Sequence, residues 1–276
     1  MPFNDAVARL TRARWESENH KHCDVWKTCR DADLVFSTDV HVDRAATANN
    51  VPGRVNVYIG DMYSAMNARF LSEKEIRVVV NMMGPPDTVD EYNKFYGPGC
   101  HWAQDKQAHE KDFMSTDLGQ PEFGQPEYQH GVEEKYMREP LAFYRQLNVA
   151  YVEETSADAQ WNAIERHFPS VIRRVWAHVV RLYHSIDCDF AERPQIQSEI
   201  NILFHCYGGR NRSASNAIAF IFWLCLYQGG ERLTMPEVME RVIRRRPMVI
   251  MKGKENHENF TRALLSFAET LDLMNL

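Results

Sequence analysis

A predicted strand, a tight turn and an apolar helix follow one another directly between Glu199 and Gln228, and this succession constrains the fold strongly. Residues 200–204 are mostly apolar and include β-branched side chains, which is typical of a buried strand. Residues 213–227 are almost all apolar or small, which predicts a buried helix. The turn between them begins with Cys206 and contains two glycines. The pattern therefore predicts a cysteine at the end of a buried strand, enclosed by a loop that leads into a helix.

This loop has the features of an anion-binding site. Backbone N–H groups in the loop and in the first turn of the helix have no partner in the helix, so they are available to a ligand. Gly208 and Gly209 permit backbone angles that other residues resist, and Arg212 offers a planar fork of donors to two phosphate oxygens. A thiol beside an arginine and a helix N-terminus has a lowered pKa. We therefore expect Cys206 to be a thiolate nucleophile beneath a bound phosphorus atom.

The residues of this loop resemble a known signature. His205, Cys206, Gly209, Arg212 and Ser213, at this spacing, resemble the motif of the cysteine-dependent protein tyrosine phosphatase superfamily. Other segments resemble its dual-specificity branch: a strand that closes in Ile-Gly, a helix containing Ala and Asn, and an Ile-x-Val-Val-Val-Asn strand, here residues 58–60, 65–67 and 76–81. The alternative, a buried structural cysteine beside a surface arginine, does not explain why these residue types occur in this order. His205 is interpreted as a structural residue that holds the loop by hydrogen bonds.

The resemblance implies a fold and an activity. The expected fold is α/β, with a central mixed, mostly parallel sheet flanked by helices. The expected enzyme is a protein-tyrosine or dual-specificity phosphatase, which hydrolyses phosphate monoesters on protein Tyr and Ser/Thr through a phosphocysteine intermediate. It needs no cofactor and no metal, and its partner is a phosphorylated protein substrate. The residues expected to bind phosphate are Cys206, Tyr207, Gly208, Gly209, Arg210, Asn211 and Arg212.

Besides the cysteine and the arginine, two residues are expected to take part in catalysis. Ser213 would hydrogen-bond the thiolate and help it leave the phosphoenzyme. Asp158 would donate a proton to the leaving oxygen. It follows a predicted strand and precedes a long amphipathic helix, which is where the family places its acid. Asp187 and Asp189 are nearer to the cysteine in sequence, but they fall in a predicted polar loop, 187–198, that we interpret as a surface excursion.

We interpret residues 1–50 as an N-terminal extension and residues 51–276 as the catalytic domain. A long insertion at about 84–140 is rich in Gly, Pro, Glu, Gln and His and shows little periodicity. Loops of this length are uncommon in compact domains and tend to be functional or mobile. A surface insertion is favoured over a lid or a substrate-docking element.

Periodicity predicts the remaining elements. Alternating or β-branched runs predict strands over 55–59, 76–80 and 147–153, and an apolar stripe predicts a helix over 164–183. A capping box at 234–237 indicates the start of another helix, and a closing amphipathic helix covers 259–271. The basic run 244–246 is interpreted as a solvated helix end.

Composition argues against several classes of protein. The net charge of −6 disfavours a nucleic-acid-binding protein, so no nucleic acid partner is expected. The six cysteines are scattered without Cys-x-x-Cys pairs, which disfavours a zinc ribbon or disulfide scaffold and favours a reducing compartment. No apolar run reaches the ~18–20 residues of a membrane-spanning helix. Acidic residues among the first arginines disfavour a mitochondrial transit helix. We expect a cytoplasmic location, with the nucleus as the alternative.

Two other functions stay open at this stage. The same chemistry could act on a non-protein substrate, because Arg210 and Asn211 resemble residues in phosphoinositide phosphatases and RNA 5′-phosphatases of the superfamily. The chain could also bind phosphorylated partners without turnover, although the complete set of Cys206, Asp158, Arg212 and Ser213 argues against this. The sequence leaves the oligomeric state and the preference between phosphotyrosine and phosphoserine or phosphothreonine open.

Overall fold

The structure is a computed structural model, and it describes Leu10 and residues 32–41, 52–83, 140–154, 161–189, 199–206, 208–228, 231–250 and 255–274. A five-stranded sheet with the order β1-β2-β5-β3-β4 lies at its centre. β1 pairs antiparallel with β2, and the other three pairings are parallel. The expected mixed, mostly parallel sheet is therefore confirmed. The strands are β1 (Asp33–His41), β2 (Pro52–Gly60), β3 (Ile76–Asn81), β4 (Ala150–Glu153) and β5 (Glu199–His205).

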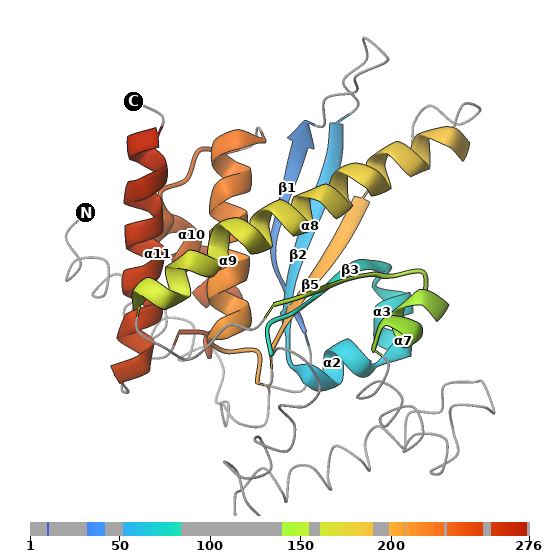
Figure 1. Ribbon diagram of the computed structural model, residues 1–276, viewed down its shortest axis with the longest axis horizontal. Helices are drawn as coiled ribbons and strands as arrows, with labels where there is room; N and C mark the ends of the chain where they lie inside the picture. Colours follow the sequence, from blue (N-terminus) through green and yellow to red (C-terminus); the bar gives the residue numbers. More distant parts are fainter. Residues whose placement is uncertain are drawn as a thin grey trace, which may run out of the picture.

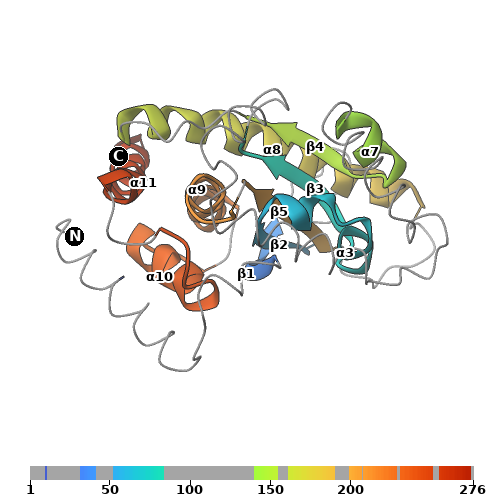
Figure 2. The ribbon, with the colours of Figure 1, turned by 90° about the horizontal axis from the view of Figure 1, so that it is seen from below.

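Helices cover both faces of this sheet. One side carries α2 (Met62–Met66), α3 (Ala68–Glu73) and α7 (Pro140–Gln146). The other carries α8 (Trp161–Asp189), α9 (Arg212–Tyr227), α10 (Met235–Arg245) and α11 (Glu255–Met274). Figure 1 shows α8 running across the sheet and α9, and Figure 2 shows the sheet between α9–α11 on one side and α3 with α7 on the other.

The two apolar layers follow from alternation along the strands. In β3, Val78 and Val80 face the larger cluster with α8 to α11, whereas Val79 faces the smaller cluster with α2, α3 and α7. In β5, Ile202 and Leu203 point to opposite clusters in the same way. Successive side chains of a strand point to opposite faces, so a strand that is apolar throughout must be covered on both. This double burial makes β5 a central strand.

β1 lies inside the range that the sequence analysis assigned to an N-terminal extension. Its residues pair with β2 from Asp33 opposite Ile59 to His41 opposite Pro52. Val35 and Val40 are buried in the larger apolar cluster. Residues 33–41 are therefore part of the central sheet, and the sequence pattern missed the strand because polar residues at 37–39 interrupt it.

Two element boundaries differ from the predicted ones. α8 continues to Asp189, so the predicted loop over 187–198 is wrong at its start, and Asp187 lies in a helix. The Tyr183 hydroxyl donates to the backbone carbonyl of Arg54 at 2.9 Å, which anchors this part of the helix to β2. β4 begins at Ala150 instead of residue 147, because α7 ends in a turn in which the Val149 N–H donates to the Tyr144 carbonyl at 2.9 Å. The other predicted elements are confirmed to within a few residues.

The capping box predicted at 234–237 is present at the start of α10. The Glu237 carboxylate accepts hydrogen bonds from the Thr234 N–H at 2.8 Å and from its hydroxyl at 2.7 Å. In return, the Thr234 side chain accepts from the Glu237 N–H, so this reciprocal cap satisfies a donor that the helix cannot satisfy itself.

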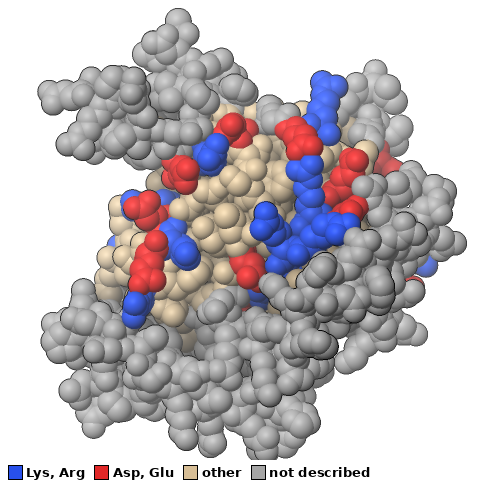
Figure 3. All heavy atoms as spheres, turned by 180° about the vertical axis from the view of Figure 1, so that it is seen from behind, with Lys and Arg blue, Asp and Glu red and all other residues tan. Residues whose placement is uncertain are grey.

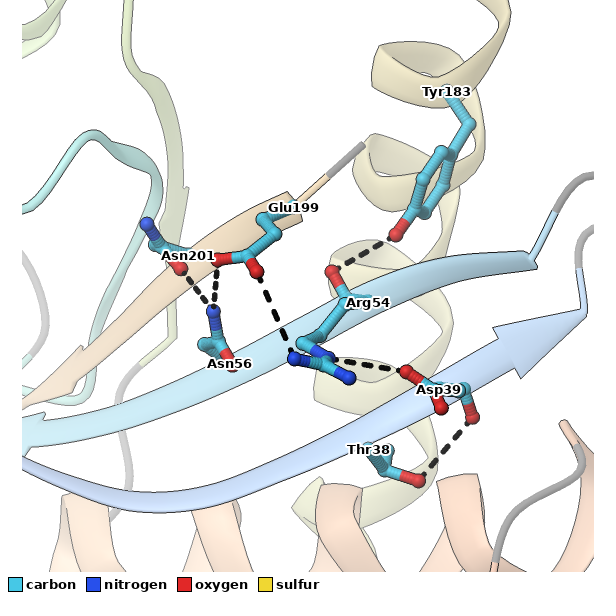
Figure 4. A network of polar contacts seen from close by, with 7 residues as sticks. All are labelled: Thr38, Asp39, Arg54, Asn56, Tyr183, Glu199 and Asn201. Atoms are coloured by element: carbon cyan, nitrogen blue, oxygen red, sulfur yellow. Dashed lines mark hydrogen bonds and ion pairs between the residues drawn. The ribbon is translucent and has the colours of Figure 1, made fainter. Parts of the chain in front are cut away.

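A polar network occupies the amino ends of the parallel strands (Figure 4). The buried Asn56 side chain donates to Asn201 Oδ1 at 2.8 Å, and the Asn201 amide donates to the backbone carbonyl of Lys74 at 2.7 Å. Arg54 forms ion pairs with Asp39 at 3.1 Å and Glu199 at 3.9 Å, but both pairs are half-exposed and contribute little. The buried amide pair joins β2 to β5, while the carboxyl ends of these strands leave space for the signature loop.

No helix among the described residues is sufficiently long and apolar to cross a bilayer.

Candidate active site

Cys206 follows the carboxyl end of the central strand. His205, the last residue of β5, lies opposite Gly60 of β2 and Asn81 of β3 in the sheet register. The Met82 N–H donates to the His205 carbonyl at 2.9 Å, so β3 and β5 are paired up to their ends. Ligands of open α/β sheets bind at this edge, outside the carboxyl ends of the strands. The sheet thus places the cysteine where a binding site is expected.

The thiol of Cys206 is buried at this edge of the sheet. The residue is only 4% exposed and its sulfur accepts a hydrogen bond from the buried Ser213 hydroxyl at 3.2 Å. Burial alone would raise the pKa of the thiol, but the Arg212 charge lowers it. Hydrogen bonds from the Ser213 hydroxyl and from the backbone amides of Ser213 and Arg210 lower it further, so that the pKa lies below its ordinary value. The loop therefore stabilises a thiolate.

His205 is fully buried and neutral. Burial lowers the pKa of its imidazole to about 3; contact with the Cys206 backbone offsets part of this effect, and the Arg212 charge adds to it. With this pKa the imidazolium form is absent near neutral pH, and the neutral imidazole is a poor base, so the residue is not suited to proton transfer. Among the described residues, neither ring nitrogen of His205 has a hydrogen-bond partner, so the side-chain hydrogen bonds that were expected to hold the loop are not found.

The two glycines of the loop are not equivalent. Gly209 has φ of +60°, and a Cβ there would lie 2.6 Å from the Gly60 carbonyl oxygen and 2.7 Å from a guanidinium nitrogen of Arg246. Both the backbone angle and the lack of space thus require glycine at this position. A Cβ at Gly208 would meet only the Arg210 side chain, at 3.7 Å, which is an ordinary contact. The sequence-based explanation for two glycines therefore holds sterically for Gly209 alone.

The start of α9 positions Arg212. Asn211 is the N-cap residue, and its side chain makes no capping hydrogen bond, so the first amides of α9 are not covered by a side-chain cap. The Arg212 carbonyl accepts hydrogen bonds from Ser215 Oγ at 3.0 Å and from Asn216 Nδ2 at 2.9 Å. These two buried polar residues, which the sequence analysis did not select, hold the helix turn from which the arginine extends.

The basic run at the end of α10 is not uniformly solvated, which corrects the sequence-based interpretation for one residue. Arg244 and Arg245 are exposed, but Arg246 is buried. Its guanidinium donates from Nε to the Gly209 carbonyl at 3.1 Å and pairs through Nη1 with Asp33 at 2.6 Å. A buried cation of this kind cannot be recognised from sequence, because its partners are far away along the chain.

The expected proton donor, Asp158, and the expected loop residue Tyr207 lie outside the described residues. The carboxylates that precede Asp158 in the described part are engaged elsewhere. Glu154 contacts Arg174 at 3.1 Å and His167 at 3.4 Å, and Glu153 accepts from the Tyr151 hydroxyl at 2.8 Å. The roles of Asp158 and Tyr207 therefore stay predictions.

The backbone of α8 shows where Asp187 and Asp189, the alternatives to Asp158 as proton donor, lie in the fold. Both residues come after Tyr183 in the last turns of α8, and the Tyr183 hydroxyl contacts the amino end of β2. This edge is separated from Cys206 by the length of β5, about 20 Å at ~3.3 Å per residue. Their position in the fold disfavours a role for either residue at the thiol.

Charges outside the loop are mixed in sign. On the face seen in Figure 3, basic and acidic side chains lie next to one another. Among the described residues, Arg241 pairs with Glu231, and Arg244 pairs with Glu240 at 2.9 Å. Within the described ranges, no three His, Cys, Asp or Glu side chains are close enough together to hold a metal ion. The positive charge that lowers the pKa of the Cys206 thiol is that of Arg212, which belongs to the signature loop.

Comparisons with known proteins find similar solved structures only. No family model matches the sequence, and no curated protein matches it. The chain is similar to human DUSP28 (14% identity, TM-score 0.40), with 78% of this chain and 90% of that chain covered. It is also similar to PTPMT1 in complex with PI(5)P (10%, 0.40; 80% and 94% covered). A third is the Yvh1 phosphatase domain from Chaetomium thermophilum (14%, 0.39; 86% and 98%). Likenesses this low assign no function, so function is inferred from the loop.

Proposed function

We propose that the protein is a phosphatase that hydrolyses phosphate monoesters on protein Tyr and Ser/Thr through a phosphocysteine intermediate. One observation carries the proposal: Cys206 lies beneath the loop with its sulfur 3.2 Å from the Ser213 hydroxyl and its pKa lowered against the effect of burial by Arg212. A buried thiol is ordinarily protonated and inert. Several interactions of the loop thus lower the pKa of this thiol, which a structural cysteine would not need.

In the first step, the Cys206 thiolate attacks phosphorus and a P–S bond forms as the P–O bond to the leaving group breaks. Arg212 and the amides of the loop stabilise the oxygens whose charge changes in this step. The departing oxygen takes a proton from Asp158, the acid suggested by the sequence pattern.

In the second step, water attacks phosphorus and the P–S bond breaks. Asp158, now a carboxylate, accepts a proton from this water. The thiolate of Cys206 leaves, and the Ser213 hydroxyl stabilises its charge through the hydrogen bond seen at 3.2 Å. Inorganic phosphate is released, and the enzyme returns to its starting state.

The decisive experiment measures phosphate release from phosphotyrosine, phosphoserine and phosphothreonine peptides by the wild type and by Cys206→Ser. A serine hydroxyl is not ionised near neutral pH, so turnover should be abolished while phosphopeptide binding persists. Activity that survives the substitution, or that is abolished by a metal chelator, would contradict the proposed mechanism. Binding without turnover by the wild type would identify a phospho-binding protein instead.

A second candidate keeps the chemistry but changes the substrate. Arg210 adds a second cationic side chain to the loop that contains Arg212, and a ligand with more negative charge than one monoester would use both. The same assay should therefore include phosphoinositides and 5′-phosphorylated RNA. A kcat/KM for either that exceeds all phosphopeptides, and that falls selectively in Arg210→Ala, would favour this candidate.

A further inference from the structure

The outer side of the signature loop is held by the turn that follows α10. Arg246 Nε donates to the Gly209 carbonyl at 3.1 Å, and the Ile250 N–H donates to the Arg210 carbonyl at 3.0 Å. Two successive carbonyls of the loop are thus bound by the segment 246–250. This segment is about 40 residues further along the chain, as the separation of 37 between Arg246 and Gly209 shows.

Arg246 is itself fixed in place. Its side chain is fully buried, and Nη1 pairs at 2.6 Å with Asp33, the first residue of β1, which is 44% exposed. A buried cation is strongly unfavourable unless it is paired and hydrogen-bonded. Its partners, which include the Asp33 carboxylate of β1 and the Gly209 carbonyl of the loop, must therefore keep their positions.

The geometry of the peptide bond links this outer contact to the inside of the loop. A trans peptide unit is planar, and its C=O and N–H point in opposite directions. Since the Gly209 carbonyl points outward to Arg246, the N–H of the same unit, on Arg210, must point inward. The Arg210 amide is one of the groups that hydrogen-bond Cys206. The Ile250 contact orients the next unit in the same sense.

Each of the two segments that meet here, the signature loop and the turn 246–250, contains a residue with a positive φ. Gly209 has φ of +60°, and Ile250, a β-branched residue, has φ of +49°. A β-branched residue in the left-handed region is strained and persists only where its surroundings hold it. Ile250 is buried and donates to the loop from this conformation. The turn is therefore held in a conformation that serves the contact.

We propose that Arg246, held by Asp33, is a positioning residue for the signature loop: it keeps the Gly209 carbonyl outside and thereby turns the Arg210 amide toward Cys206. It acts through the peptide unit and is not a catalytic residue. The claim rests on the proposed function for its effect on turnover, but its effect on the thiol is independent of any substrate. Arg212 and the neutral His205 also adjoin the thiol and are unchanged by the test.

The test compares Arg246→Lys with Arg245→Lys and Asp33→Asn. Lysine keeps the charge but has no Nε donor and no fork to join the carbonyl to the carboxylate. Arg245 is the exposed neighbour and serves as the matched control. Alkylation of Cys206 by iodoacetamide is followed against pH by mass spectrometry of its peptide. Cys225, whose pKa is raised to about 11 by burial, is an internal reference that should stay unmodified near neutral pH.

In Arg246→Lys, the pH midpoint of Cys206 alkylation should move upward, and inorganic phosphate should protect the thiol less well. Loss of hydrogen bonds that involve a charged group should lower kcat/KM about 10- to 100-fold. Asp33→Asn should shift the midpoint in the same direction by a smaller amount. Arg245→Lys should match the wild type in all three measurements.

Wild-type midpoints in folded Arg246→Lys and Asp33→Asn would overturn the positioning role. If Arg246→Lys does not fold, as judged by thermal unfolding, Asp33→Asn decides, since its side chain is half-exposed. A wild type without phosphatase activity would defeat the proposed function, while the alkylation profiles would still support or overturn the role of Arg246.

Discussion

The pKa values of two adjacent residues, His205 and Cys206, are both lowered, but for opposite reasons. Burial dominates at His205 and keeps the imidazole neutral, whereas at Cys206 the charge of Arg212 and three hydrogen bonds outweigh burial. The difference arises because the histidine is enclosed by β2 and β3, while the thiol faces the donors of the loop. Both effects have measurable consequences.

His205→Asn should flatten the acid sensitivity of stability. The pKa of His205 is about 3 in the folded protein against 6.5 as its ordinary value, so between these values the unfolded chain binds a proton that the native protein does not. Stability should therefore fall with decreasing pH through this window, by up to about 1.4 kcal/mol per pH unit. Urea unfolding at several pH values between 4 and about 7.5 measures this slope. Parallel curves for wild type and variant would contradict the assignment.

Gly209→Ala should impair the loop far more than Gly208→Ala. Alanine at Gly209 would need φ of +60° and would collide with the Gly60 carbonyl and Arg246, whereas at Gly208 its Cβ meets only ordinary contacts. Strain of this kind costs about 1–3 kcal/mol, so kcat/KM should drop by roughly 10- to 100-fold for Gly209→Ala. Gly208→Ala, measured in the same assay, should stay near the wild type. Equal effects would show that both positions need glycine for another reason.

At the scale of elements, α8 connects the two edges of the sheet. Near its middle, Arg174 donates to the Glu153 carbonyl at 2.6 Å and pairs with Glu154, so the carboxyl end of β4 is bound to the helix. Near its end, Tyr183 contacts β2 at the amino edge. The connection that contains Asp158 thus starts from a fixed strand end, whereas Asp187 belongs to the opposite edge.

Asp158→Ala should lower kcat by ~10²–10⁴ while leaving phosphate affinity intact, because it removes the acid and not the anion site. The basic limb of the pH–rate profile should flatten, since this limb reports loss of the proton from Asp158. Substrates with good leaving groups, such as p-nitrophenyl phosphate, should be affected least. Asp187→Ala is the control and should retain the limb. The reverse result for the two variants would move the acid to α8 and refute the position inferred from the sequence pattern.

At the scale of the whole molecule, the signature loop and the buried Asn56–Asn201 pair lie at opposite ends of the parallel strands. Cys206 lies at the carboxyl end of β5, and the Asn56–Asn201 pair joins β2 to β5 near the amino end. The two ends of β5 lie about 20 Å apart at ~3.3 Å per residue, and sites at such a distance usually contribute to stability independently. The two edges should therefore respond separately to mutation.

Asn201→Ala should destabilise the fold without changing catalysis. It removes two hydrogen bonds, one from Asn56 and one to the Lys74 carbonyl, at a total cost of about 1–3 kcal/mol. Asn56 keeps its hydrogen bond to Glu199 at 3.1 Å. Thermal unfolding measures this loss, and kcat/KM at a temperature well below the transition should equal that of the wild type. A matching loss of kcat/KM in the folded variant would mean that the amino edge is coupled to the loop.

Local patterns were sufficient for much of this protein. The doubly buried strands β3 and β5 are apolar at most of their buried positions, with Asn81, Asn201 and His205 as exceptions. Helix α10 begins at a capping box that lies within four consecutive residues. The signature residues are also contiguous, so the contact of Ser213 with Cys206 could be anticipated from their spacing. In each case the physical cause lies within one turn or one strand, and a short window of sequence contains it.

Tertiary structure alone decided the features whose partners are distant. β1 is polar in its middle and becomes a strand only because β2 offers a pairing edge. Helix α8 continues to Asp189, beyond the apolar stripe that ends at Tyr183, where the Tyr183 hydroxyl contacts β2. In the sequence, nothing distinguishes Arg246 from the two arginines before it. The fold places its side chain between Asp33 and Gly209, which are 213 and 37 residues away along the chain. A buried charge is stable only with its partners in place, and such partners are assembled by the sheet and not by the local chain.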